Sequence, residues 1–238
     1  MPYHQDLDQL LMRARELELY TAQTAERSGR VRELRAWQAQ RLDRTYAWLR
    51  REPRYVPALE FFLSDLYGPG DSFRRDEDLR RALIPLKRAL PAALLDILHS
   101  ALELQVLTSE LDLEMVSRLE PGDITDVSYA QAYRLVGRPD DRKHQIELTC
   151  LIGADLSRVV RKRWLAVALR AAHFPAQVAG FDVLQSFLER GFRAFRQIGD
   201  ARELLMTIRD RETALMESLL RADQSAVANV MQRGRAHV

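Results

Sequence analysis

Little in this sequence interrupts a helix or builds a sheet. It has 10 glycines and 9 prolines in 238 residues, and no Asn-Gly or Asp-Gly pair that would favour a tight β-hairpin. Apolar and polar residues do not alternate over any sustained stretch, which excludes a strand-rich fold. Because hydrophobic residues make up 47% of the chain, a disordered chain is excluded as well.

Cysteine and the common catalytic motifs are nearly absent. Cys150 is the only cysteine, so no disulfide can form within the chain, and its neighbours Leu148 and Leu151 predict a small buried side chain. The sequence contains no Gly-x-Ser-x-Gly elbow, Cys-x-x-Cys pair, His-Glu-x-x-His helix or phosphate-binding loop. No established class of catalyst is therefore indicated.

Neither an excess charge nor a long apolar run is present. The chain carries 36 basic and 34 acidic residues, a net charge of +2, which gives no general case for nucleic acid or membrane as a partner. The best apolar candidate for a membrane span, residues 164–174, is interrupted by Arg170. Residues 1–6 lack the basic start of a signal peptide. We expect a soluble, cytoplasmic protein.

What the sequence does contain is helical periodicity over almost its whole length. Residues 1–54 form a predicted N-terminal helical arm with one narrow apolar stripe. We expect the arm to break near Gly29 and to pack on the core or on a second copy of the chain. Residues 55–222 form the predicted helical core and residues 223–238 a ragged tail. The predicted fold is a single all-α domain, a multi-helix bundle of roughly six to eight helices with a long N-terminal arm.

Turn signals divide the core into helices. The strongest is Gly68-Pro69-Gly70, and Pro175 is expected to end a short apolar helix. The predicted helices cover residues 57–67, 76–86, 91–118, 125–136, 139–161, 164–172, 176–198 and 201–220.

One segment resembles a known family. Residues 61–71, Phe-Phe-Leu-Ser-Asp-Leu-Tyr-Gly-Pro-Gly-Asp, resemble an uncharacterised proteobacterial family of helical proteins marked by an FFLxxLYG segment. Residues 101–104 and 184–192 are similar to the same family, and the likeness covers roughly residues 55–215. That family has no established activity. The resemblance therefore implies a helical fold and a bacterial origin and assigns no catalytic residue.

Two predicted helices carry candidate metal ligands. His99, Glu103 and Glu110 recur at spacings of four and seven residues and so share one helix face. His144 and Glu147 lie one turn apart on a later helix. Imidazole and carboxylate groups on facing helices can hold a divalent metal inside a bundle, but the Glu-x-x-His motif of such sites is absent. The alternative is a solvated face with contacts between neighbouring helix positions.

Glu103 stands among leucines, in Ala-Leu-Glu-Leu-Gln-Val-Leu, where a buried carboxylate would need a partner. Arg142 and Arg190 are the candidate partners. A structural ion pair that holds two helices in register is the first interpretation, and a ligand-binding or metal-binding carboxylate is the second. Glu189 and Arg190 suggest a similar structural pair on the late helix, where Gly191 indicates close approach of a neighbouring element.

The densest basic cluster consists of Arg158, Arg161, Lys162 and Arg163. One interpretation is a site for phosphate or nucleic acid. The other is a helix C-terminus, where cations complement the helix dipole and cap carbonyl groups.

These patterns favour a non-enzymatic interaction or structural protein that works as a homodimer or with a protein partner, because the arm is amphipathic and no catalytic motif is present. No cofactor, membrane or nucleic-acid partner is expected. The rival hypothesis is a helical protein, a metalloenzyme included, that binds a small ligand or a divalent metal through carboxylate and histidine side chains inside the bundle.

Overall fold

The structure, a computed structural model, describes residues 7–61 and 91–221, and every regular element in these ranges is a helix. This confirms the predicted all-α fold. In chain order the helices are α1 (Leu7–Ala22), α2 (Ala25–Thr45), the 3-10 helix η1 (Ala47–Arg51), α3 (Val56–Phe61), α5 (Ala92–Arg118), α6 (Asp126–Val136), α7 (Pro139–Val159), α8 (Arg163–Val178), α9 (Asp182–Ile198) and α10 (Arg202–Leu220). Residues 62–71 of the FFLxxLYG segment, the predicted helix over residues 76–86 and the predicted tail lie outside the described residues.

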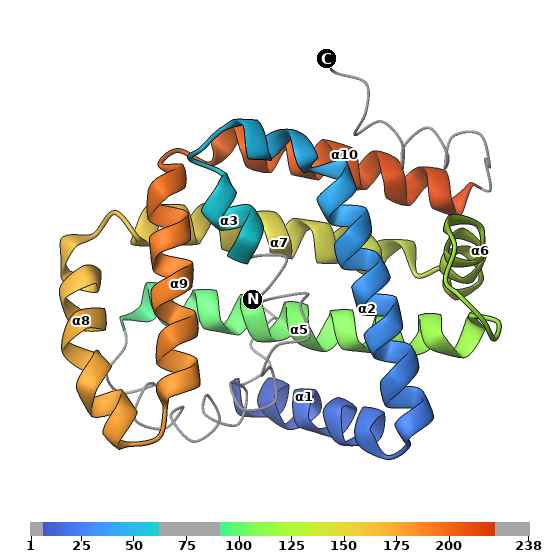
Figure 1. The fold of residues 1–238 in the computed structure, drawn as a ribbon, viewed down its shortest axis with the longest axis horizontal. Coiled ribbons are helices and arrows are strands. Elements are labelled where there is room, and N and C mark those ends of the chain that lie inside the picture. The colour runs from blue at the N-terminus through green and yellow to red at the C-terminus, as the bar shows by residue number, and fades with distance from the viewer. Residues whose placement is uncertain (1–6, 62–90, 222–238) are drawn as a thin grey trace.

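The long helices are stacked side by side. Helix α7 packs between α5 and α10, and α1 packs on the opposite side of α5 (Figure 1). Helix α2 crosses this stack near one end, while α9 crosses it near the other and carries α8 on its outer side. The predicted arm is thus packed on the core, because Leu10 and Leu11 of α1 are buried against Leu102 of α5.

The arm divides at a different position from the predicted one. Helix α1 ends at Ala22 and α2 begins at Ala25, whereas Gly29 lies inside α2. The reason is local capping: the side-chain oxygen of Thr24 accepts a hydrogen bond from the backbone N–H of Arg27, 3.2 Å away. Such an N-cap stabilises a helix start by about 1 kcal/mol, and one glycine in a helix costs about the same without breaking it.

Local chemistry sets the two ends of α6. Thr125 begins α6 with a capping box, in which Thr125 and Ser128 satisfy each other's backbone N–H groups. Gly137 ends α6 with a backbone φ of 65°, a conformation that glycine adopts without strain. These chemical signals explain why the predicted range 125–136 nearly matches α6.

The end of the short apolar helix was predicted wrongly. Helix α8 continues through Pro175 to Val178, and α9 begins at Asp182 rather than at Ala176. A proline past the first turn removes one helical hydrogen bond and crowds the carbonyl four residues earlier, which was the reason to expect a stop there, but α8 extends three residues beyond Pro175. The chain instead turns at Gly180, which has a φ of 75°.

Aromatic contacts fill the bundle between the helices. The Trp37 ring of α2 stacks on Tyr129 of α6 with centroids 4.0 Å apart. Phe61 of α3 packs on Phe187 of α9, with ring centroids 5.1 Å apart. Gly191 lies under the same ring: a Cβ added there would be 3.0 Å from Cζ of Phe61. This confirms the close approach that Gly191 indicated. None of the described helices is long and apolar enough to cross a bilayer.

Candidate functional site

Glu103 of α5 lies between two histidines. Its Oε1 is 2.8 Å from Nε2 of His144 on α7, and its Oε2 is 3.9 Å from Nδ1 of His99, one turn earlier on α5. The Glu103 side chain is 29% exposed, so the cluster is in contact with solvent. The structure therefore brings these candidate metal ligands together in a carboxylate–imidazole contact that joins α5 to α7.

The arginines considered as partners of Glu103 lie elsewhere. Arg142 is only 4% exposed and stacks over the ring of Tyr133, 4.1 Å from its centroid. Within the described part of the chain, Nε and Nη2 of Arg142 have no hydrogen-bond partner. Arg190 is exposed on α9. Histidine, and not Arg142, is thus the partner of Glu103 that the geometry shows.

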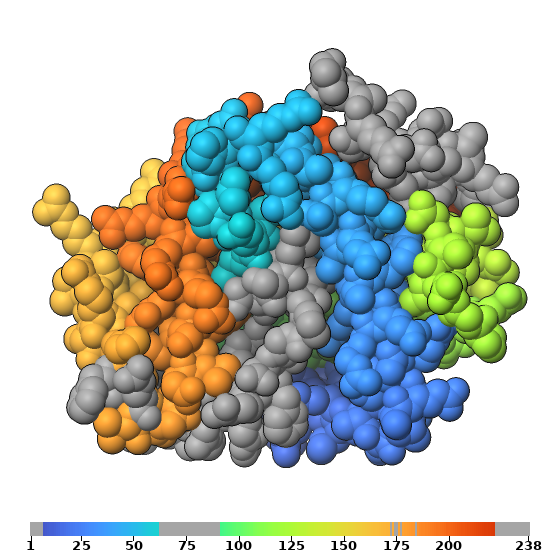
Figure 2. Space-filling model, viewed as in Figure 1, coloured from blue at the N-terminus to red at the C-terminus, as the bar shows by residue number. Residues whose placement is uncertain are grey.

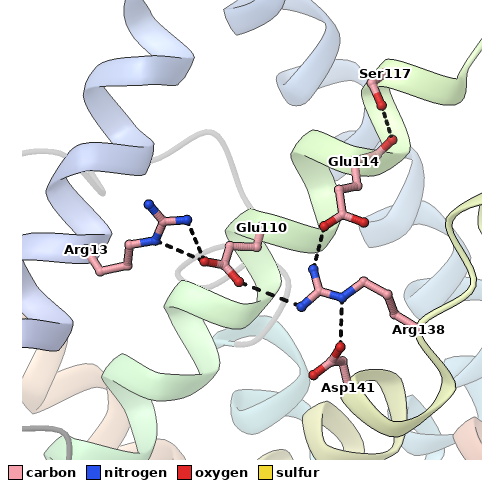
Figure 3. A network of polar contacts seen from close by, with 6 residues as sticks. All are labelled: Arg13, Glu110, Glu114, Ser117, Arg138 and Asp141. Atoms are coloured by element: carbon pink, nitrogen blue, oxygen red, sulfur yellow. Dashed lines mark hydrogen bonds and ion pairs between the residues drawn. The ribbon is translucent and has the colours of Figure 1, made fainter.

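Glu110 is the centre of a surface network (Figure 3). Arg13 of α1 donates from Nε and Nη2 to Oε1 of Glu110, at 3.0 and 2.8 Å. Arg138, which precedes α7 in the left-handed conformation, lies 3.8 Å from Oε2 of Glu110 and also pairs with Glu114 and Asp141. Because these pairs are partly exposed, each stabilises the fold by no more than about 1 kcal/mol. Glu110 therefore ties α1, α5 and the start of α7 together.

Glu147 lies apart from the other candidate ligands. It is exposed on α7, and its carboxylate is 3.9 Å from Nζ of Lys143, one turn earlier. Over residues 7–61 and 91–221, no group of three or more His, Cys, Asp and Glu side chains is placed to hold a metal ion. The predicted convergence of His99, Glu103 and His144 is present, but Glu110 and Glu147 point into other contacts.

A buried polar row between α2 and α5 was missed at the sequence level. Asp112 of α5 is 2% exposed, and its two oxygens accept hydrogen bonds from Nε of Arg35 and Nε2 of Gln38, at 3.0 and 3.1 Å. A buried carboxylate requires such donors, because leaving it unpaired would cost several kcal/mol. Asp112 therefore fixes the crossing of α2 over α5.

The same row continues to α10. Arg41 donates from Nη1 to both oxygens of Glu212, and the Tyr46 hydroxyl donates to Oε1 of Glu212 at 2.8 Å. Burial alone would lower the pKa of Arg41, but the adjacent Glu212 raises it above its ordinary value. Burial, followed by the charge of Glu212, raises the pKa of the Tyr46 hydroxyl. Both groups thus keep their protons, and Glu212 stays between two donors.

A pattern in the sequence could have revealed this row. The apolar stripe of α2 reaches Trp37 and continues at helical spacing through Gln38, Arg41 and Thr45, all of which are buried. Polar residues that extend a buried stripe must be partnered inside the protein. The partners Asp112 and Glu212 could not be identified, because their pairing depends on tertiary arrangement.

Some cations of the basic cluster form contacts within the chain, and others are exposed to solvent. Arg158 pairs with Asp155 one turn earlier. Arg161 donates to a carbonyl oxygen of the preceding turn and to one in the connection between α9 and α10. Lys162 and Arg163 are exposed at the start of α8. Arg161 thus behaves as a cation that caps a helix end, while its neighbours face solvent.

Helix α8 presents an apolar face to solvent. The exposed fractions of Trp164, Val167 and Val178 are 45%, 61% and 73%, and Ala168 and Ala171 between them are exposed as well. Val167 and Ala168 are adjacent and the other spacings are three and seven, so all five residues lie on one side of the helix. We call them the α8 stripe. In the space-filling view α8 lies at the outer edge of the molecule, beyond α9 (Figure 2).

The opposite side of α8 is tied to α9. Nδ1 of His173 is 2.7 Å from Oε1 of Glu189, and Gln185 donates to the same oxygen and to the backbone carbonyl of Leu169. The hydrogen bond from Gln185, followed by the contact with His173, lowers the pKa of Glu189. Glu189 therefore acts with His173 and Gln185 to hold α8 with its apolar stripe facing outward.

These features define the chain as an all-helical bundle protein whose buried charges link helices. Residues 18–226 match the model of a protein family described as "Domain of unknown function (DUF8198)". Because the match covers most of the chain, the chain belongs to this family. No curated protein and no solved structure matches it. Its function must therefore be argued from its own geometry.

Proposed function

We propose that this chain is a non-enzymatic interaction protein, a helical bundle that binds a protein partner through the α8 stripe. The observation that carries the proposal is the exposure of Trp164, Val167 and Val178 on one side of a single helix. Single exposed apolar side chains are common, but several on one side of the same helix favour a surface that another molecule covers. The partner is a second copy of the chain, as in a homodimer, or a different protein.

The use of the charged residues supports this proposal. Glu110, Asp112 and Glu212 all accept hydrogen bonds from arginines on other helices. Carboxylates that are held in this way stabilise the packing of helices and are not poised for proton transfer. Leu10 and Leu11 of α1 are buried against Leu102 of α5. Helix α1 also exposes Met12, Leu19 and Tyr20, but the Arg27 guanidinium covers the ring of Tyr20, so we place the partner on α8.

A photo-crosslinking amino acid at position 167 tests the proposal in cells that naturally carry the chain. The expected result is a protein adduct, identified by mass spectrometry, that does not form from position 127. Val127 is the matched control, because it is a 68% exposed valine on α6. Analytical ultracentrifugation of the purified chain shows whether the partner is a second copy. If position 167 gives no protein adduct beyond that of position 127, the proposal is wrong.

A second candidate function is the binding of a divalent metal or a small ligand at Glu103. The observation that favours it is the placement of His99 and His144 on either side of the carboxylate. Imidazole and carboxylate groups are the ligands that zinc and related metals prefer. Metal analysis of protein purified without chelator tests it: about one ion per chain would support this candidate.

We also propose the proteobacterial origin that the resemblance of residues 61–71 implies.

A further inference from the structure

We infer that the α8 stripe takes an acidic amphipathic helix of a partner protein as its occupant. This inference rests on the proposed function and adds the chemistry of the partner. It combines two independent features of α8, namely the shape of its apolar face and the sign of the charges around that face.

The shape of the stripe suits a helix. With about 100° of rotation per residue, the five side chains of the stripe cover an arc of about 100° on α8. The small Ala168 and Ala171 lie in its middle, while the larger Trp164 and Val178 lie near its ends. Small side chains let a second helix approach to an interaxial distance of about 8 Å, and the larger residues then contact its flanks.

The charged side chains of α8 itself have one sign. The sequence contains no Asp or Glu between Asp155 and Asp182. Arg163 and Arg170 are exposed and seven residues apart, so they lie along the same edge of the stripe, and Lys162 is exposed just before the helix. A partner helix that places its apolar residues on the stripe therefore meets cations along one edge. Glutamate or aspartate at its own edge would complement them.

A carboxylate of α9 that faces α8 is already in use. Glu189 faces α8 from α9, where its Oε1 contacts His173 and accepts a hydrogen bond from Gln185. His173 lies on the side of α8 away from the stripe, because it is five residues from Ala168 and two from Ala171. Glu189 therefore does not neutralise the edge that Arg163 and Arg170 form.

Other occupants fit the same features less well. An anionic membrane would take the cations, but Ala168 and Ala171 would insert little apolar volume into it. A nucleic acid would leave Val167 and Val178 in water. A second copy docked symmetrically through the same face would bring the cationic edges of both chains into one interface. An acidic helix uses both the apolar residues and the charges.

Selection from a library of displayed helical peptides tests the inference. The full chain is the bait, and the library varies the exposed positions of one helix. We expect enriched helices with a net negative charge and apolar residues spaced three or four apart. Their binding should be lost with Val167→Glu and weakened about tenfold with Arg163→Glu combined with Arg170→Glu. Circular dichroism and thermal melting of each variant confirm that it is folded.

The controls lie on α6. Val127→Glu and Arg134→Glu change an exposed valine and an exposed arginine away from α8, and both variants should bind the selected helices as the unchanged chain does. Enrichment of neutral or basic helices, or equal loss of binding in the α6 variants, would overturn the inference.

Two further arms separate the inference from the proposed function. The chain is tested on phosphatidylglycerol vesicles and on duplex DNA, and its self-association is measured by ultracentrifugation. Binding to either probe that Val167→Glu abolishes, without enrichment of acidic helices, would overturn the inference. A dimer that Val167→Glu dissociates, again without such enrichment, would overturn the inference while leaving the proposed interaction function intact.

Discussion

Arg41 of α2 and Glu212 of α10, 171 positions apart in the sequence, form a largely buried ion pair whose side chains are 11% and 17% exposed. Nη1 of Arg41 donates to both carboxylate oxygens at 2.7 and 2.9 Å. The Tyr46 hydroxyl completes the arrangement. We predict that Glu212→Gln lowers the free energy of unfolding by roughly 3–5 kcal/mol, because it leaves the Arg41 cation buried without a counter-charge. Urea unfolding followed by circular dichroism measures the loss.

The exposed pair of Glu217 and Arg221 provides the control for this prediction. These side chains are 51% and 69% exposed and lie one turn apart on and just after α10. Glu217→Gln should change the free energy of unfolding by no more than about 0.5 kcal/mol. Equal losses in the Glu212 and Glu217 variants would show that burial of the Arg41 pair does not determine its contribution.

Arg142 is the counterpart of Arg41, because it is equally buried but has no carboxylate in contact within the described residues. We predict that Arg142→Met leaves the free energy of unfolding unchanged or raises it by about 1 kcal/mol. The methionine keeps most of the volume and removes unpaired N–H groups, while the lost stacking on Tyr133 offsets part of the gain. Arg41→Met should instead be destabilising, since it strands Glu212. A large loss in both variants would contradict this.

Local chemistry in the sequence determined much of the fold. The sequence predicted a helix over residues 125–136, and α6 covers nearly the same range because a capping box at Thr125 begins it and the positive-φ Gly137 ends it. The division of the arm was misplaced because a single capping hydrogen bond from Thr24 outweighs the weak preference of Gly29. Local signals of this kind act within one turn, so they specify helices and not the way helices meet.

Only part of the candidate site could be predicted from the sequence. The sequence drew attention to Glu103 and offered Arg142 and Arg190 as its partners, whereas its carboxylate contacts His144, which lies 41 positions away on another helix. The exposure of Trp164 and Val167 could not be predicted, because an apolar helix face has the same sequence pattern whether it packs inside the chain or faces solvent. Only the position of α8 on the outer side of α9 shows that this apolar face is exposed to solvent and not packed inside the chain.

Two helical glycines have opposite surroundings, which gives a matched pair of substitutions. A Cβ at Gly153 of α7 would lie 2.6 Å from Cδ2 of Leu205, whereas a Cβ at Gly29 of α2 would have no atom within 4 Å. We predict that Gly29→Ala raises the free energy of unfolding by about 0.5–1 kcal/mol through helix propensity. Gly153→Ala should lower it by roughly 1–3 kcal/mol, because the Leu205 side chain must leave its packed position to make room for the new methyl group. Thermal and urea unfolding measure both changes, and a gain in both variants would refute the tight contact.

Glu189 should make the attachment of α8 depend on pH. Its pKa in the folded chain lies below the ordinary value of 4.5. The ionised carboxylate therefore contributes stability that is present above about pH 4.5 and is lost as the pH falls through the lower folded value. We predict that Glu189→Gln flattens the decline in unfolding free energy between about pH 6 and about pH 3. Identical pH profiles for the two proteins would show that Glu189 does not stabilise this contact.

The contact between Glu103 and His144 distinguishes the proposed interaction protein from a metal-binding one. If the contact is structural, Glu103→Gln lowers the free energy of unfolding by about 0.5–1 kcal/mol, because the side chains are partly exposed and one charged hydrogen bond is weakened. Metal analysis of the unchanged chain should then give far less than one ion per molecule, and added zinc should not raise its melting temperature. The opposite outcome is that zinc raises the melting temperature of the unchanged chain but not that of the Glu103→Gln variant. Zinc would then bind the folded chain through the Glu103 carboxylate, and metal binding would replace the proposed function.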